Sequence, residues 1–361
     1  MIAFPILPGI EINLFLLIFI ALGAGVVSGF AGVGGAFIVM PALIILGFPA
    51  ILAVGTSLTW VMGNSIIGAF RHGKLGNVDI RLGSIMAMAT MGGIEIGVRI
   101  INRAKDIGLA DEVVLSISIC MLLSVGVYTL VESSRKKRQL DELIETKGAA
   151  PLDMRKPFLS LKLQSIKIPP VLHFTKSGVS ISLWIMLVVG FFIGMVIGIV
   201  GVGGGFIMVP ALIYLIGLPS FIAVGTDLFQ IIFSAAFGSI RHTMSGNVSI
   251  FTSVIMLVAS SIGVQFGVLV THYVHGISVR LVLGISIVIA AIGPIFKLLN
   301  IILGGTVPWL ETGSKLFTFS GMGLAMIMII ALFIIAQRFR QGRYIPTRMK
   351  SFVSKADLSE R

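Results

Sequence analysis

Two glycine clusters inside apolar segments are the features of this sequence best suited to holding a ligand. Residues 32–35 read GVGG and residues 201–205 read GVGGG, each with a proline farther on, at Pro41 and Pro210. Glycine tolerates backbone conformations that leave N–H groups outside a helix, and in lipid such groups must face protein or a ligand. The segment after each cluster is about half a membrane span long, and a helix N-terminus at that depth favours an anion. We therefore expect an anion site near the bilayer midplane, formed by the backbone N–H groups of Gly34, Gly35, Gly203, Gly204 and Gly205. Close helix packing is the alternative interpretation of the clusters.

A polar stripe follows each glycine cluster. The residues at i, i+4 and i+8 are Thr56, Trp60 and Asn64 in the first half, and Thr226, Gln230 and Ser234 in the second. This spacing places each set on one face of a helix. Hydroxyl and amide groups can hold an oxyanion without a fixed charge, so we expect Thr56 and Thr226 to bind the ligand and Asn64 and Gln230 to shape its site. Hydrogen bonds between helices are the alternative.

Two carboxyl groups lie well inside apolar segments. Asp227 aligns with Ser57 of the first half, and Glu95 aligns with Gln265 of the second. Ionisable groups at membrane depth are costly and are functional candidates by default. A buried carboxyl is easier to keep neutral than charged, so we expect Asp227, and with it Glu95, to carry a proton in a coupled process. Structural capping or pairing is the alternative.

Two Arg-His pairs recur at the ends of apolar segments, at Arg71-His72 and Arg241-His242. Long basic side chains at such positions often anchor a helix in the headgroup region. Their recurrence also suits two vestibules that attract anions. Both interpretations stay open at this point.

The segments that must position these residues have the composition of membrane helices. Of 361 residues, 56% are hydrophobic and only 12% are charged, which excludes a disordered chain and argues against a water-soluble globule. Almost no charge occurs in the windows 14–27, 51–70, 113–131, 183–200, 281–295 and 319–336. Apolar windows near this length are typical of membrane-spanning helices.

The chain is an internal repeat. Residues 29–43 and 198–212 are identical at 10 of 15 positions, and residues 53–78 match 223–248 at 11 of 26. Repeats of this kind are typical of secondary transporters. We divide the chain into a first transmembrane repeat, a basic linker, a second repeat with one extra helix, and a basic tail, with bounds at 1–131, 132–178, 179–336 and 337–361.

Charge predicts the orientation of the repeats. Residues 132–178 carry ten Lys/Arg against five Asp/Glu, and residues 337–361 carry seven against two. Basic flanks mark the cytoplasmic side, so the second repeat must cross the membrane an even number of times. The first then crosses an odd number of times, which places the N-terminus outside. We therefore expect an all-α polytopic membrane protein with two inverted repeats, glycine-broken or re-entrant helices, and about 7–10 crossing helices. If each interrupted segment crosses once, the repeats are parallel instead.

Several functions are disfavoured. Cys120 is the single cysteine, so one chain can form neither a disulfide nor a zinc site from cysteines. The sequence has no catalytic triad, HExxH or paired-carboxylate pattern, so we expect no enzyme, cofactor or metal. The positive charge follows the membrane flanks, so we expect a lipid bilayer rather than nucleic acid as partner. Homodimerisation stays open.

The paired GxGGxxxxxP elements, each followed by AVGT and then by RHxxxGNV, resemble the sulfite exporter TauE/SafE family of membrane permeases. These elements lie at 32–41, 53–56, 71–78, 201–210, 223–226 and 241–248. The resemblance implies a multi-pass permease of a prokaryotic cell membrane that moves small anions such as sulfite, sulfonates, sulfoacetate or related carboxylates. The thiosulfate-transporting relatives rely on several cysteines, so Cys120 alone speaks against that substrate. The alternatives are a passive anion channel of the same fold and a membrane scaffold or sensor that signals through residues 132–178.

Overall fold

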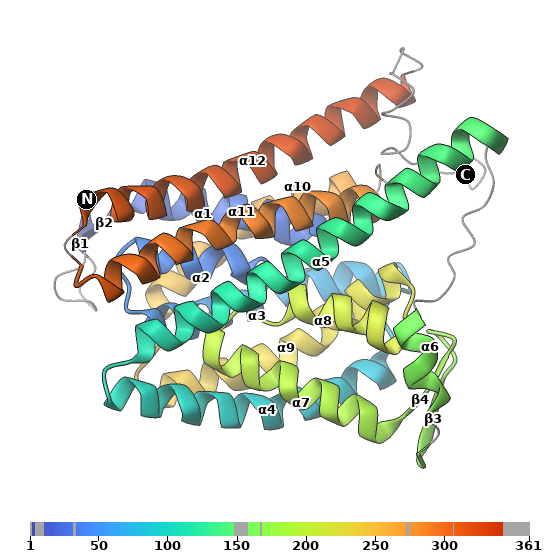
Figure 1. The fold of residues 1–361 in the computed structure, drawn as a ribbon, viewed down its shortest axis with the longest axis horizontal. Helices are drawn as coiled ribbons and strands as arrows, with labels where there is room; N and C mark the ends of the chain where they lie inside the picture. Colours follow the sequence, from blue (N-terminus) through green and yellow to red (C-terminus); the bar gives the residue numbers. More distant parts are fainter. Residues whose placement is uncertain are drawn as a thin grey trace.

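The computed structural model describes residues 2–3, 11–31, 34–147, 158–166, 168–271, 274, 276–305 and 307–341. Helices account for nearly all of this part of the chain (Figure 1). The first half contains the helices α1 (Leu14–Ala31), α2 (Ala36–Ile45), α3 (Ala50–Lys74), α4 (Ile80–Asp106) and α5 (Ala110–Lys147). The second half contains α7 (Leu183–Val200), α8 (Gly205–Ala211), the π-helix η1 (Leu212–Ile216), α9 (Ser220–Met244), α10 (Ile250–Thr271), α11 (Gly276–Ile302) and α12 (Pro308–Arg340). A short helix, α6 (Phe158–Ser165), and two hairpins, β1–β2 (Ile2–Ala3, Glu11–Ile12) and β3–β4 (Val171–Phe174, Val179–Ser182), complete the list.

Within the described residues, eight helices are long and apolar enough to cross a membrane: α3, α4, α5, α7, α9, α10, α11 and α12. The remaining apolar helices are α1, which is just shorter, and the half-length segments Ala36–Ile45 and Gly205–Ile216. The expected all-α polytopic membrane fold is therefore confirmed.

The glycine clusters break the apolar segments as expected. The first segment ends α1 at Ala31 and restarts at Ala36 after Gly35, whose φ of 72° is left-handed and therefore suits glycine. The second ends α7 at Val200 and restarts at Gly205, after two left-handed glycines, Gly203 and Gly204. Gly32 and Val33 lie outside the described residues. All ten side chains of α2 are buried, so this half-length helix lies in the centre of the molecule.

Glycines allow the tightest helix contacts. A methyl group built on Gly93 of α4 would collide with the carbonyl oxygen of Phe191 on α7, and one on Gly194 of α7 would collide with that of Thr90. The equivalent pair, α1 and α10, is equally close at Gly25 and Gly263. Small residues that let backbones approach are typical of helix interfaces in membranes.

Corresponding helices of the two halves run in opposite directions where they touch. The hydroxyls of Thr59 on α3 and Ser239 on α9 are 2.6 Å apart, whereas Gly68, nine residues later on α3, lies against Leu228, eleven residues earlier on α9. Helices α5 and α11 are antiparallel by the same criterion: Gly126 lies against Val288, and Gly284 against Leu130.

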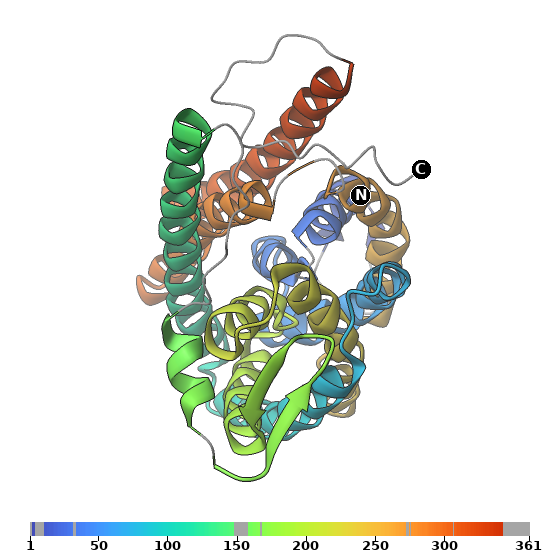
Figure 2. The ribbon, with the colours of Figure 1, turned by 90° about the vertical axis from the view of Figure 1, so that its right-hand side faces the viewer.

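Two described parts of the basic linker region, α6 and the β3–β4 hairpin, pack against the helices. Helix α5 continues without a break from the first repeat to Lys147, and α6 and the β3–β4 hairpin follow beside α7 and α8 (Figures 1 and 2). In the hairpin, Val171 pairs with Ser182 and Phe174 with Val179. Linker residues 148–157 and tail residues 342–361 lie outside the described residues.

Candidate functional site

The two glycine turns meet at one side chain of α3. A methyl group built on Gly203 would come within 2.6 Å of Val61 Cγ1, and one on Gly34 would come within 3.3 Å of the same atom. Ile231 of α9, which occupies the position equivalent to Val61, also borders Gly34. The structure therefore brings together the two clusters that the sequence predicted to share a site.

The backbone N–H groups at these turns are available. Among the described residues, none accepts a hydrogen bond from the N–H of Gly34, Gly35, Gly203 or Gly204. No side chain caps α2 or α8 either. Gly205 is the first residue of α8. Unpaired backbone donors in a buried position are costly unless a ligand or water meets them, so the turns have the donors that an anion needs.

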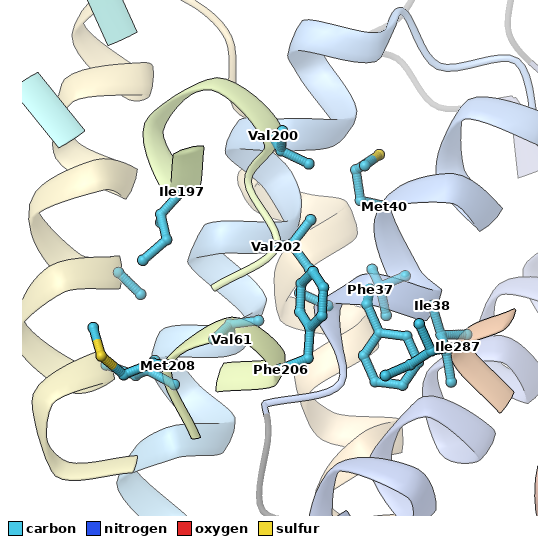
Figure 3. Close-up of a cluster of buried hydrophobic side chains, with 14 of the residues drawn as sticks. Phe37, Ile38, Met40, Val61, Ile197, Val200, Val202, Phe206, Met208 and Ile287 are labelled. Atoms are coloured by element: carbon cyan, nitrogen blue, oxygen red, sulfur yellow. The ribbon is translucent and has the colours of Figure 1, made fainter. Parts of the chain in front are cut away.

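The side chains around the turns are apolar (Figure 3). Phe37 of α2 and Phe206 of α8 face each other with ring centroids 5.8 Å apart, and both are fully buried. Val61 lies beside them. The polar groups at this point are therefore backbone groups, and the polar side chains lie farther along α3 and α9.

One polar chain lies beside the first turn. The Trp60 indole donates to Ser260 Oγ of α10 at 2.9 Å, and Ser260 donates to Asn64 Oδ1 at 3.0 Å. The ring of Trp60 also borders Gly35. Asn64 is buried, and its Nδ2 has no partner among the described residues. This amide is a free donor on the face where the sequence placed it.

A second polar chain contains the buried carboxyl. Thr90 of α4 donates to Gln230 Oε1 at 3.2 Å, and Gln230 Nε2 donates to Asp227 Oδ1 at 3.0 Å. Asp227 is fully buried, and its Oδ2 has no partner in the part of the chain that the structure describes. The two chains correspond, because Trp60 aligns with Gln230 and Ser260 aligns with Thr90.

Thr90 and Ser260 are site residues that the sequence interpretation missed. Each is a hydroxyl residue on the helix after the polar stripe, at the same position of the two repeats. Extending the repeat alignment into α4 and α10 would have found them.

Thr56 and Thr226 each form a hydrogen bond with a loop of the opposite repeat. Thr226 Oγ1 accepts from the backbone N–H of Asp79 at 3.0 Å, and Thr56 Oγ1 accepts from that of Ser249 at the same distance. The preceding glycines, Gly55 and Gly225, leave no room for a methyl group beside the carbonyls of Asn247 and Asn77. Each AVGT element therefore receives the GNV element of the other half. Ser234, the last residue of its stripe, bonds only the carbonyl of Ile231 in its own helix.

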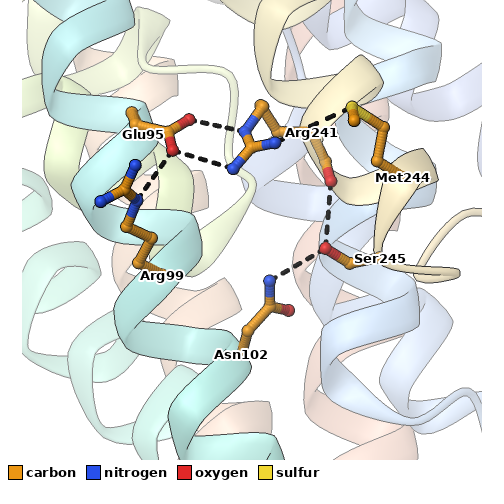
Figure 4. A network of polar contacts seen from close by, with 6 residues as sticks. All are labelled: Glu95, Arg99, Asn102, Arg241, Met244 and Ser245. Atoms are coloured by element: carbon orange, nitrogen blue, oxygen red, sulfur yellow. Dashed lines mark hydrogen bonds and ion pairs between the residues drawn. The ribbon is translucent and has the colours of Figure 1, made fainter.

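The predicted ionisable groups Glu95 and Arg241 lie together between α4 and α9 (Figure 4). Arg241 contacts both carboxylate oxygens of Glu95, at 2.5 and 2.8 Å, and Arg99 contacts one of them at 2.8 Å. Arg71, the equivalent of Arg241, has no ion-pair partner among the described residues. The residue equivalent to Glu95 in the second half is Gln265, which is not an acid.

The two predicted vestibule histidines are buried. His242 Nε2 lies 3.1 Å from the carbonyl oxygen of Gly198, at the end of α7, and His72 is 8% exposed at the end of α3. His242 therefore packs between helices α9 and α7. Within the described residues, no group of three His, Cys, Asp or Glu side chains could hold a metal.

Fold and site define a multi-pass membrane protein built from two related halves with paired broken helices. The sequence model of the family described as sulfite exporter TauE/SafE matches residues 17–293, and the chain belongs to this family. It is a member of a transporter family and not of an enzyme family.

Curated relatives carry transporter names. The probable membrane transporter protein YunE of Bacillus subtilis is 22% identical over 76% of this chain and 94% of its own length. The probable membrane transporter protein YjnA of the same organism is 21% identical over 75% of this chain and 98% of its own. Sulfite exporter TauE/SafE family protein 2 of Arabidopsis thaliana is 28% identical over 30% of this chain and 24% of its own. No solved structure matches.

Proposed function

We propose that this membrane transporter is a secondary permease for a small oxyanion, such as sulfite, a sulfonate or sulfoacetate, in a prokaryotic plasma membrane. One observation carries the proposal: two glycine turns from different halves of the chain meet at Val61, and the N–H groups of Gly34, Gly35, Gly203 and Gly204 have no acceptor among the described residues. Donors without fixed charge can replace part of an anion's hydration and still release it.

The side chains next to the turns supply the rest of the proposed site. Asn64 contributes an amide beside the first turn that has no described partner, and Gln230, the equivalent of Trp60, contributes an amide bonded to Asp227 on α9. Thr56 and Thr226 use their oxygens as acceptors for loop N–H groups, so each retains only its hydroxyl hydrogen for a ligand.

Proton coupling is proposed for Asp227. It is fully buried, its single described partner is the neutral Gln230, and one oxygen is unpaired. A carboxyl in such a place is favoured in its neutral form and ionises only when solvent or a cation reaches it. Glu95 is already paired with two arginines, which makes it a poorer proton carrier than Asp227.

We propose an inverted arrangement of the two repeats, and the contacts of α4 support it. The β3–β4 hairpin binds the start of this helix, where Ser177 donates to Asp79 at 2.5 Å. The α9–α10 turn binds its end, where Lys105 donates to Asn247 at 2.6 Å. Twenty-seven residues separate these ends by about 40 Å, more than the hydrocarbon thickness of about 30 Å. The equivalent α3–α4 and α9–α10 turns would therefore lie on opposite sides of the membrane. The side that holds the basic linker and the α3–α4 turn would be the cytoplasmic side.

Uptake into proteoliposomes tests the function. We expect saturable accumulation of sulfite or sulfoacetate that depends on a proton gradient, with sulfate and taurine as comparison solutes. Uptake that rises linearly with concentration and follows only the anion gradient would indicate a passive channel. Absence of any anion flux or thermal stabilisation would leave the scaffold or sensor interpretation.

A pair of glycine variants locates the site. Gly35→Ala adds a methyl group at a left-handed residue beside the Ala24 carbonyl, which must displace the turn. Losing one charge-assisted hydrogen bond, about 1.5–3 kcal/mol, predicts an affinity about 10- to 100-fold weaker. Gly73→Ala is the matched control, because nothing lies within 4 Å of its added methyl group. Equal affinity in the two variants would place the anion site elsewhere.

A further inference from the structure

We infer that four buried apolar side chains, Phe37, Phe206, Val61 and Ile231, form the gate of this transporter and set the size of the anion that passes. We call them the apolar quartet. The inference rests on the proposed function and names the residues that control passage through that same site.

The quartet is built from equivalent positions of the two repeats. Phe37 and Phe206 are the phenylalanines of the two GxGGxF elements, and Val61 and Ile231 each lie five residues after the AVGT threonine. All four have an exposed fraction of 0%. Because the pairs come from α2 with α8 and from α3 with α9, the quartet joins the halves at their centre.

The quartet lies between the donors of the two turns. Val61 Cγ1 borders both Gly34 and Gly203, while Phe37 and Phe206 close the space next to it, ring against ring (Figure 3). An anion held by one turn therefore reaches the other only if these side chains move. None of the four side chains of the quartet has a polar atom, so none of them would hold water between the turns.

Apolar constrictions in membrane pathways close by excluding water. A dry quartet would block ions and water while leaving each turn free to bind an anion from its own side. Such separation is what a carrier needs, because a continuous wet path would dissipate the gradient that drives it. The branched side chains of Val61 and Ile231 would limit how large a group can pass.

The first test of the gate is the passive leak of chloride through the protein. Val61→Thr keeps the side chain's shape and adds a hydroxyl that can hold water in the constriction. We expect chloride to leave loaded proteoliposomes about tenfold faster than with the wild type, equivalent to about 1.4 kcal/mol off the barrier. Val98→Thr is the control, since Val98 is equally buried on α4 outside the quartet. A folded Val61→Thr protein that leaks no more than Val98→Thr would overturn the gate.

The second test is size selectivity. Val61→Ala removes two methyl groups, so uptake of sulfoacetate relative to sulfite should rise about tenfold if the quartet limits size. An unchanged ratio in a transporting variant would overturn that role. The two claims can fail separately: wild-type protein with no anion uptake would contradict the proposed function, whereas the chloride leak of Val61→Thr tests the gate even then.

Discussion

At the scale of single residues, the most unusual group is the carboxyl of Asp227. It is enclosed by protein, it accepts one hydrogen bond from Gln230, and its second oxygen has no described partner. Burial of an unpaired charge is far more costly than burial of a neutral acid. A group with this environment changes its charge when the surrounding structure opens, which is the property that a proton-coupled carrier needs.

We predict that Asp227→Asn abolishes the acceleration of uptake by an imposed proton gradient but preserves substrate binding. Asparagine keeps the side chain's size and the oxygen that accepts from Gln230, and it cannot carry a proton. Initial uptake rates across a pH gradient and thermal-shift titration measure the two properties. Asp111→Asn is the control, because Asp111 caps the start of α3 through the Ala50 N–H. Retained pH dependence in Asp227→Asn would make Asp227 a structural residue.

Thr226 gives a second test at this scale. Replacing it with valine leaves the buried N–H of Asp79 without its acceptor, so the free energy of unfolding should fall by about 1–3 kcal/mol. Thermal unfolding in detergent measures the loss, and Thr312→Val, at an exposed helix position, should cause none. If Thr226→Val weakens the anion affinity while stability is unchanged, the hydroxyl acts on the ligand and its contact with the loop is secondary.

At the scale of helices, glycine determines which pairs can approach. Helix α4 crosses α7 at Gly93 and Gly97, and α1 crosses α10 at the equivalent Gly263 and Gly267. In lipid the association of helices depends on close packing, since lipid tails are as apolar as the side chains. These crossings therefore hold the α1–α2 and α7–α8 segments in place beside the opposite repeat.

Neighbouring glycines of α4 provide a matched pair of variants. Gly93→Ala would force a methyl group into the Phe191 carbonyl, whereas at Gly92 the nearest atom is 3.8 Å away. We predict that Gly93→Ala lowers the unfolding free energy by about 1–3 kcal/mol, as overpacking does. Gly92→Ala should be neutral or slightly stabilising, because alanine favours a helix more than glycine does. Equal stability of the two variants would contradict the packing of α4 on α7.

The sequence predicted the broken helices because a left-handed turn depends on the local glycines. A GVGG motif inside an apolar segment is compatible with few other backbone structures. The sequence also predicted that Asn64 lies on one helix face with Thr56, and Gln230 on one face with Thr226. It could not predict that Thr56 binds the backbone of Ser249, 193 residues away, because that contact depends on how the halves pack. Nor did the prolines and mixed charges of the linker indicate the β3–β4 hairpin or a helix α5 that continues to Lys147.

At the scale of the whole molecule, two related halves exchange contacts. Each AVGT element binds the GNV loop of the other half. In addition, Trp60 of the first polar stripe bonds the hydroxyl of Ser260 on α10, and Gln230 of the second stripe bonds that of Thr90 on α4. The halves therefore cannot separate into independent domains. A movement of one half against the other would change the glycine turns, the apolar quartet and the surroundings of Asp227 together.

The two halves differ in the charges around the equivalent ends of α3 and α9. On the side of the α9–α10 turn, Arg241 is neutralised by Glu95. On the linker side, Arg71 has no described acidic partner, and Lys176 of the hairpin donates to the Val78 carbonyl nearby. On the linker side, Arg71 and Lys176 are therefore two cationic side chains without an acidic partner among the described residues, and such groups attract an approaching anion.

The proposed anion site requires the two repeats to have opposite orientations, since only then do the glycine turns reach the centre from opposite sides of the membrane. Lys74 and Met244 are equivalent, exposed residues at the ends of α3 and α9. In a Cys120→Ala background, Lys74→Cys and Met244→Cys are each exposed to a membrane-impermeant maleimide in right-side-out vesicles. We predict that Met244→Cys is labelled at once and that Lys74→Cys, like Lys162→Cys in the linker, is labelled only after permeabilisation. Labelling of Lys74→Cys and Met244→Cys from the same side would show parallel repeats and contradict the account.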